Sequence, residues 1–266
     1  MTSEPFRFPK FFVTVPSPCP YLPGRFERKL FTELTGENAA AFHDFLARVG
    51  FRRSQRIAYR PACEACSACL SVRIPVAEYV FTRRDRRILR RNADLAVETI
   101  TPAKATPEHY QLLMRYLRAR HADGEMTEMS YPEYRNMVEN SPISTELLVY
   151  RSRTGDERPL LAATITDPMA DGLSMVYSFY EPTAARRSLG RFMILDHIRR
   201  AQARGLNHVY LGYWVEDSPK MAYKAEFRPL EVLIGQEWRR FAERERPKGE
   251  ECEGQDESES RTQRAS

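Results

Sequence analysis

The sequence predicts a mixed α/β protein of the α+β kind, in which a small cysteine-containing N-terminal domain precedes a larger domain of strands and helices. From residue 95 onward, apolar residues recur with strand and helix periods in the order β-α-α-β-β-β-loop-α-β-α-β. Before residue 95 the chain combines prolines, arginines and clustered cysteines. We therefore divide it into domains at 1–94 and 95–242, followed by a charged tail at 243–266 that we expect to be disordered.

Composition narrows the class of protein. At 266 residues and 42% hydrophobic content, the chain is long and apolar enough to bury a core. It has no run of eighteen apolar residues, and its N-terminus lacks the basic and apolar regions of a secretory signal. We expect a cytoplasmic protein with no membrane partner, whose five cysteines are better suited to metal or redox chemistry than to disulfides.

Prolines and one glycine set the expected structure before residue 51. The prolines between 16 and 23 exclude a helix there and place Cys19 in a turn. A helix follows and ends at Gly50. Its apolar face is expected to consist of Phe42, Phe45, Leu46 and Val49.

A cysteine loop lies between short strands expected at 56–59 and 72–76. Its cysteines, spaced three residues apart, are Cys63, Cys66 and Cys69. This spacing is a common half-site for a tetrahedral metal ion, and Cys19 is the candidate fourth ligand. The spacing does not choose between zinc and an iron–sulfur cluster. Small, partly buried loop residues are the alternative explanation.

An arginine-rich helix follows, opened by a capping box of Thr82 and Asp85. Its broad basic face carries Arg83, Arg87, Arg90 and Arg91. The chain has a net charge of +5, and such a face is suited to the phosphates of a nucleic acid. A merely solvated helix surface is the alternative.

The larger domain begins with a strand at 95–100 and two helices with clear start signals. Pro107 opens the first helix, and Ser130 with Glu133 caps the second. The later elements are expected to be strands at 146–151, 160–166 and 173–180, a helix ending at Arg204, a strand at 209–213, a helix at 218–226 and a strand at 230–235.

Two stretches of this domain could carry chemistry. The glycine-bearing loop Arg186–Arg191 precedes a helix, whose unpaired N–H groups and dipole can hold a phosphate. The segment 213–229 offers tyrosines and lysines that could orient a carbonyl or a ribose, although a surface amphipathic helix would look the same. His121 is more simply explained as complementing a helix dipole than as a catalyst. No serine-protease-type elbow or nucleotide-triphosphate loop is present.

The element order from 95 to about 236 resembles the GNAT acyltransferase fold, in which the glycine loop cradles the pyrophosphate of an acyl carrier. Phe192 departs from the glycine or alanine that is usual there. Across residues 6 to 240 the chain also resembles the arginyl-tRNA–protein transferase family. The stretches that carry this resemblance are Cys19–Arg25, Tyr59–Cys63 with the two cysteines after it, and Tyr213–Pro229.

Within that family, the short architecture with Arg120-His121-x-Asp123-Gly124 is similar to the bacterial aspartate/glutamate leucyltransferases. Leu22 stands where eukaryotic members have a second cysteine. The resemblance implies transfer of leucine from Leu-tRNA to proteins with N-terminal Asp or Glu, which marks them for degradation machinery that recognises N-terminal Leu. No organic cofactor is implied. An arginyl donor, an acyl-CoA-dependent N-acetyltransferase and a non-catalytic RNA-binding module with structural zinc are the alternatives.

The resemblance also assigns roles to residues. The acceptor α-amine, with an ordinary pKa of about 7.7–8.0, attacks an activated ester, so positioning is expected to supply most of the rate. Arg187 and Gly190 are expected to hold the phosphates or terminal adenosine. The expected catalytic residues are Glu181 as base with Tyr213, Lys220 and Tyr223. The other tRNA- or aminoacyl-binding residues are expected to be Arg83, Arg87, Arg90, Tyr177, Tyr180 and Lys224, and the metal ligands Cys19, Cys63, Cys66 and Cys69.

Overall fold

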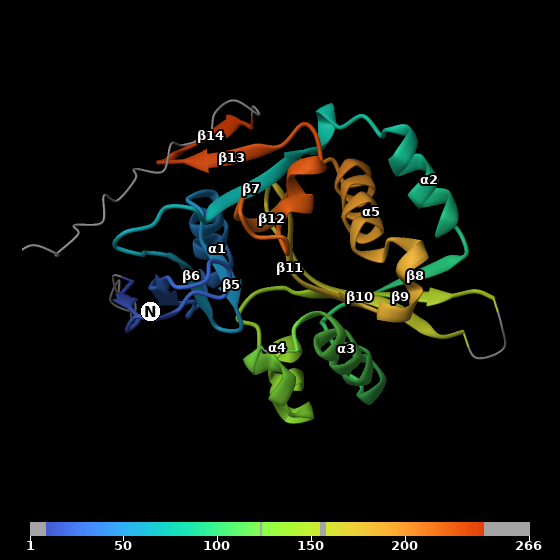
Figure 1. Cartoon of the computed structure of the whole chain (residues 1–266), viewed down its shortest axis with the longest axis horizontal. Coiled ribbons are helices and arrows are strands. Elements are labelled where there is room, and N and C mark those ends of the chain that lie inside the picture. The colour runs from blue at the N-terminus through green and yellow to red at the C-terminus, as the bar shows by residue number, and fades with distance from the viewer. Residues whose placement is uncertain (1–8, 123, 155–157, 242–266) are drawn as a thin grey trace, which may run out of the picture.

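The computed structural model describes residues 9–122, 124–154 and 158–241, which build two main sheets, a short two-stranded pair and several helices (Figure 1). The tail expected at 243–266 lies outside the described residues. The larger sheet consists, in spatial order, of β14 (Glu237–Arg240), β13 (Glu231–Ile234), β7 (Leu70–Pro75), β12 (His208–Trp214), β11 (Gly172–Tyr180), β10 (Leu160–Pro168), β9 (Glu146–Ser152) and β8 (Leu95–Ile100). The mixed α/β class is thereby confirmed.

The smaller sheet belongs to the N-terminal part of the chain. Its antiparallel strands are, in spatial order, β1 (Phe11–Val13), β4 (Lys29–Glu33), β6 (Ile57–Pro61) and β5 (Arg52–Ser54). A two-residue pair, β2 (Ser17–Pro18) with β3 (Phe26–Glu27), closes the proline-rich turn. The predicted helix is α1 (Ala39–Arg48), and Gly50 follows it with φ +89°. Phe45 was expected on the apolar face and is instead 60% exposed, because His43, Leu46 and Ala47 supply the buried face.

The larger sheet extends across the predicted domain boundary at 94/95. Strand β7 precedes the boundary, yet it pairs antiparallel with β12 on one side and β13 on the other. The strands of the smaller sheet thus end with β6, and β7 already belongs to the larger sheet, while the domain boundary at 94/95 stays a prediction. The sequence could not show this, since an antiparallel partner far along the chain leaves no local signal.

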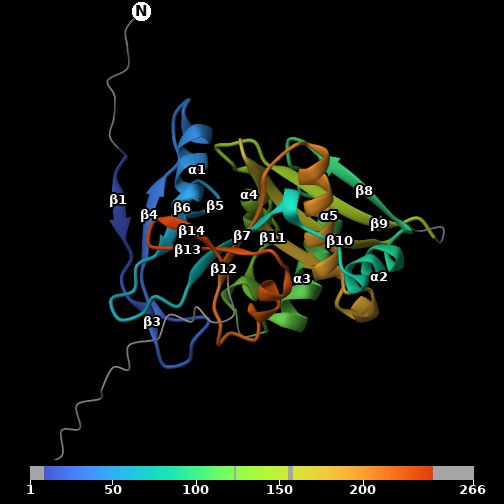
Figure 2. The same ribbon diagram turned by 90° about the horizontal axis from the view of Figure 1, so that it is seen from above.

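Helices cover both faces of the larger sheet. On one face lie α2 (Arg83–Arg91) and α5 (Leu189–Ala203), and on the other α3 (Pro107–Arg120) and α4 (Tyr131–Glu139) (Figure 1). Both expected capping boxes, at Thr82 with Asp85 and at Ser130 with Glu133, are confirmed. In the views of Figures 1 and 2, α2 and the smaller sheet lie on opposite sides of α5. None of the described helices is long and apolar enough to cross a bilayer.

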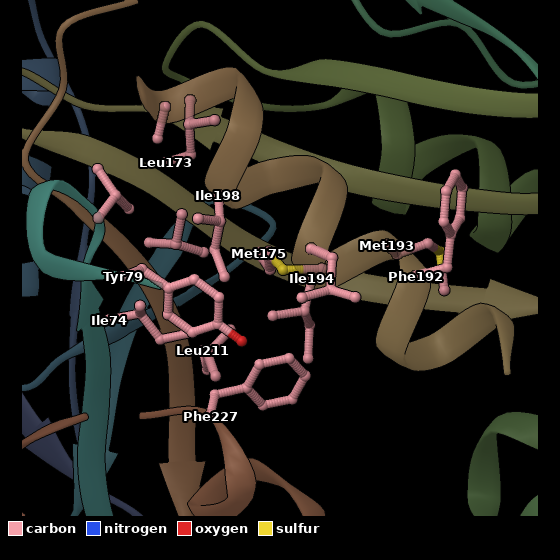
Figure 3. Packing of buried hydrophobic residues seen from close by; sticks show 14 of the residues in the cluster. Ile74, Tyr79, Leu173, Met175, Phe192, Met193, Ile194, Ile198, Leu211 and Phe227 are labelled. Atoms are coloured by element: carbon pink, nitrogen blue, oxygen red, sulfur yellow. The ribbon is translucent and has the colours of Figure 1, made fainter. Parts of the chain in front are cut away.

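The chain after β12 forms short 3-10 turns rather than the helix expected at 218–226. Only Ala222–Glu226 (η4) is helical, and Met221 and Lys224 donate their backbone N–H to carbonyls three residues earlier. Two anchors favour this tighter path: Lys224 turns back toward β12, and Phe227 is completely buried. Figure 3 shows the Phe227 ring beside Leu211 of β12 in the hydrophobic cluster beneath α5.

Strands β11 and β12 separate part of the way along the sheet. They pair in parallel only from Gly172 with His208 to Ser174 with Tyr210. Beyond that point each strand stays paired to its outer neighbour, and each of those pairings has a register shift at the same level. Bulges of this kind increase local twist and frequently lie beside functional sites. The separation positions the candidate site.

Candidate active site

The Arg52 guanidinium fills one side of the opening between β11 and β12. It reaches across from β5 and donates through Nη2 to the carbonyl oxygens of Met175 (3.0 Å) and Val176 (2.9 Å) on β11. Gly212 of β12 makes room for it: φ is +74° there, and a Cβ would lie 1.9 Å from Nη1 of Arg52. A glycine inside a strand often marks such a close approach. The opening is thus specified by one arginine and one glycine from different sheets.

The Lys224 ammonium fills the other side. From η4 it donates to the carbonyl oxygens of Leu211 (2.9 Å) and Tyr213 (2.6 Å) on β12. Burial, followed by the charge of Arg52, lowers the pKa of Lys224 to about 7. Lys224 was expected to bind phosphate or aminoacyl groups as a charged side chain. That role stays a prediction, and the structure adds that the amine is buried against strand carbonyls and is about half neutral near pH 7.

An ion pair within the protein fixes the strand that carries Arg52. The neighbouring Arg53 donates to both carboxylate oxygens of Asp167 on β10, at 2.6 and 2.7 Å, and both side chains are buried. Thr145 donates to the same carboxylate at 2.8 Å. Since a buried pair with satisfied partners is costly to disrupt, β5 is held firmly against the larger sheet. This contact sets where Arg52 enters the opening.

Tyrosines line the mouth of the opening beside the start of α5. The Tyr180 ring lies 4.9 Å from that of Tyr116, and its hydroxyl accepts a 3.0 Å hydrogen bond from Arg120. Burial raises the pKa of Tyr177 to about 12 and that of Tyr116 further, the latter also through Tyr177, Tyr180 and Tyr223. These phenols stay protonated near neutral pH and offer aromatic faces and hydroxyl donors. Such a wall is suited to an apolar side chain or a nucleobase.

Glu181 is held by donors rather than poised as a base. It caps the turn η3 (Pro182–Arg187), accepts from the Thr183 N–H and hydroxyl, and pairs with Arg115 at 2.9 Å. Burial alone would raise the pKa of Glu181, but the hydrogen bonds from Thr183 and Arg115 outweigh it and lower the pKa below its usual value. A carboxylate stabilised in this way is a poor proton acceptor. The proposed base role therefore finds no support in its contacts.

The glycine loop lies where the sequence predicts it, but its Arg187 side chain is engaged by another residue of the protein. Ser188 adopts the left-handed conformation (φ +55°) before α5. Gly190 follows inside the first turn, where a Cβ would meet the Tyr180 ring at 3.3 Å. The Arg187 guanidinium, however, is engaged by both oxygens of Asp94 at 2.8 and 2.9 Å. It therefore faces Asp94 rather than an incoming phosphate.

Helix α2 presents the expected basic face. Arg83, Arg87 and Arg90 are exposed, and none forms an ion pair within residues 9–122, 124–154 and 158–241. Arg84, by contrast, is paired with Glu226 at 2.5 Å. Three solvated guanidinium groups on one face are available to a polyanion.

The remaining predicted residues divide between the mouth and a separate pocket. Lys220 is exposed. Burial lowers the pKa of His121, and the charges of Lys220 and Arg120 lower it further, so these three side chains lie near one another. Tyr223 is 37% exposed beside Tyr180. Tyr213 was expected at the transfer centre but is buried, with its hydroxyl 3.0 and 2.9 Å from the carbonyl oxygens of Gly50 and Tyr59.

The cysteines surround that separate pocket, a cavity of about 350 Å³ beside Tyr213. Its lining includes Cys19, Cys63, Cys66 and Cys69. Burial, and then the charges of the other three cysteines, raise the pKa of Cys69 to about 12, so Cys69 stays protonated near neutral pH and the four side chains lie close together. Even so, the described residues contain no set of three side chains placed to hold a metal ion. The predicted zinc or iron–sulfur site is therefore unsupported by this geometry.

Arg52 and Tyr116 belong to the site although the sequence did not single them out, and Arg120 entered only as part of a motif, with no role assigned to it. Arg52 follows the Gly50 stop and lies on another sheet from its contacts, so no spacing rule connects it to β11. The one usable signal was Gly212 inside an otherwise apolar strand.

Comparison with known proteins gives two matching family models. The N terminus of arginine-tRNA-protein transferase matches residues 17–87 and the C terminus matches residues 108–234. An aspartate/glutamate leucyltransferase of Phenylobacterium zucineum is 54% identical over 249 residues, which cover 92% of this chain and 96% of that protein. Another, of Parvibaculum lavamentivorans, is 56% identical over 233 residues, covering 88% and 95%. Among solved structures, a lysylphosphatidylglycerol synthetase C-terminal domain from Agrobacterium fabrum aligns with a TM-score of 0.46 and 13% identity, over 73% of this chain and 61% of that one.

These matches define an enzyme class, the aminoacyltransferases. Within it, the chain belongs to the arginine-tRNA-protein transferase family, whose two models together cover most of the described residues.

Proposed function

We propose that this protein transfers leucine from Leu-tRNA to the α-amino group of proteins whose first residue is Asp or Glu. The observation that carries the proposal is the similarity, along nine-tenths of the chain, to relatives named aspartate/glutamate leucyltransferase. The new N-terminal leucine would then mark the acceptor for machinery that recognises such ends. An Arg-tRNA donor is the second candidate, because the family description itself names arginine.

The reaction requires positioning more than proton transfer. The neutral α-amine attacks the ester carbonyl carbon, the new C–N bond forms, and the C–O bond to the ribose breaks. The departing 3′ oxygen gains a proton, and the amine loses one. An ester is already activated toward amines, and correct alignment can supply much of the rate. The tyrosine wall supports this reading, since it would offer aromatic surface to the leucine side chain and hydroxyl donors to the reacting carbonyl.

The tRNA would approach over α2 and the start of α5. Arg83, Arg87 and Arg90 offer solvated charge on that side. The first turn of α5, with Gly190 against Tyr180, would receive the terminal phosphates or adenosine through backbone N–H groups. Arg187 is left out of this assignment because Asp94 occupies it.

A transfer assay tests the proposal. Purified protein is mixed with radiolabelled Leu-tRNA or Arg-tRNA and with peptides that begin with Asp, Glu, Ala or Lys. We expect leucine on the Asp and Glu peptides alone. Arginine on those peptides would retain the reaction and replace the donor. No product from either tRNA, with acetyl transfer from acetyl-CoA instead, would overturn the proposal.

A further inference from the structure

We propose that Arg52 binds the side-chain carboxylate of the acceptor's first residue and thereby selects Asp and Glu. This inference rests on the proposed function and adds to it the residue that reads the acceptor. It starts from the two cations that meet at one opening, Arg52 from β5 and Lys224 from η4.

Arg52 keeps unused donors at this opening. Only Nη2 is bonded to β11, and Nη1 and Nε make no hydrogen bond to any of the described residues. Neither atom is among the fully buried polar atoms that lack a partner in the described part of the chain, so neither is completely closed off from solvent. One end of the guanidinium is therefore anchored while the other can accept an anion.

The positive charge at the opening is not neutralised by the protein. Within the described ranges, no carboxylate pairs with Arg52 or Lys224, although Arg53 next to Arg52 is fully paired with Asp167. The charge of Arg52 instead contributes to the lowered pKa of Lys224. A partly buried cation without a counterion is unfavourable, and an incoming carboxylate would relieve it.

The surroundings favour a carboxylate over a tRNA phosphate. Arg52 enters from the smaller sheet, whereas the exposed arginines of α2 lie on the opposite side of α5 (Figures 1 and 2). Tyr223 and Tyr213 lie close enough to Arg52 for its charge to act on their hydroxyls. Arg52 is only partly buried, so an acidic side chain would meet the exposed edge of its guanidinium while the α-amine stays at the tyrosine mouth.

The test compares Arg52→Gln with the wild type on peptides that differ only in the first residue, Asp against Asn and Glu against Gln. The readout is the ratio of kcat/KM values within each pair. Losing a buried charge partner should lower the Asp-to-Asn ratio about thirtyfold or more, and the KM for Leu-tRNA should stay unchanged. Arg52→Lys should fall between the two, because it keeps the charge without the planar donors. Arg60→Gln, on the adjacent strand β6, is the matched control and should keep the wild-type ratio.

Each outcome has a separate meaning. An unchanged ratio in Arg52→Gln overturns the inference, and an unchanged ratio with a raised KM for Leu-tRNA assigns Arg52 to a phosphate instead. A wild type that transfers leucine to none of the peptides overturns the proposed function itself. If Arg52→Gln does not fold, the wild type decides: an Asp peptide should protect Arg52 from phenylglyoxal and an Asn peptide should not. Equal protection by both would contradict the inference.

Discussion

Two groups of positively charged side chains in this molecule differ in their exposure to solvent. Arg83, Arg87 and Arg90 extend from α2 into solvent without ion pairs to described residues. Arg52 and Lys224 are drawn between strands and bonded to backbone carbonyls. Solvated charge attracts a polyanion at long range, but it is screened by salt and does not distinguish one sequence from another. A desolvated charge recognises its partner through direct hydrogen bonds and so discriminates between chemical groups. The contrast predicts one surface for affinity and one opening for selectivity.

The sharpest way to break the opening is Gly212→Ala. The added Cβ would lie 1.9 Å from Nη1 of Arg52, and φ of +74° already disfavours alanine. Because a displacement of about 1 Å at a reacting centre can cost about a hundredfold, we expect at least that loss in the rate of leucine transfer. Gly205→Ala is the matched control, since Gly205 also has positive φ (+66°) but no heavy atom within 4 Å of the added Cβ. Equal losses in both variants would attribute the effect to backbone strain alone.

The surface is tested by replacing Arg83, Arg87 and Arg90 together with glutamine. Affinity for tRNA should fall about tenfold to a hundredfold at low salt, and the slope of log K against log salt should decrease by about 2 to 3. The ratio of rates on Asp and Asn peptides should not move. Filter binding over a salt series measures the first effect, and Arg239→Gln, already paired with Glu237, is the control. An unchanged slope would remove α2 from the tRNA interface.

Local signals in the sequence predicted most of the fold. The capping boxes at Thr82 and Ser130 and the glycine stop at Gly50 were read correctly because the residues that make them are neighbours in the chain. The 218–226 helix was wrong because Lys224 and Phe227 are anchored to β12 and the core, and tertiary contacts override helical propensity.

The site was harder to predict than the fold. The glycine loop lies beside Tyr180, as the strand–loop–helix order predicts, whereas Tyr213 is buried away from the mouth. The engagement of Arg187 by Asp94 joins residues 93 positions apart, and sequence spacing cannot predict such a pair. Arg52 was missed for the same reason, because its function depends on how the two sheets meet.

The two cations of the opening can be separated by pH. With a pKa of about 7, Lys224 is mostly charged at pH 6 and mostly neutral at pH 8, whereas the Arg52 guanidinium stays charged. The groups facing Lys224 are Arg52, the carbonyls of β12 and the neighbouring tyrosines, whose phenols remain protonated over this range. The Asp-to-Asn ratio of kcat/KM should therefore fall about fivefold from pH 6 to pH 8. The ratio cancels titration of the α-amine, which both peptides share. A ratio independent of pH would leave Arg52 as the sole recognition charge.

The smallest effect is expected from a substitution of Glu181, whose charge is also bound by neighbouring donors of the protein. Its carboxylate already accepts from Thr183 and Arg115, and those hydrogen bonds outweigh burial in lowering its pKa. To act as a base, Glu181 would have to lose these hydrogen bonds before it takes a proton. As an N-cap, by contrast, it can be replaced by glutamine, whose amide oxygen keeps most of the hydrogen bonds. Glu181→Gln should thus reduce the single-turnover rate of leucine transfer less than about tenfold. Loss of a true general base would reduce that rate by about a hundredfold or more. Thr183→Val, which removes one donor from the same carboxylate, should have a similarly small effect on the rate. A hundredfold loss confined to Glu181→Gln, with the pH profile shifted, would restore Glu181 as the base and place proton transfer, rather than alignment at the tyrosine wall, in the rate-limiting step.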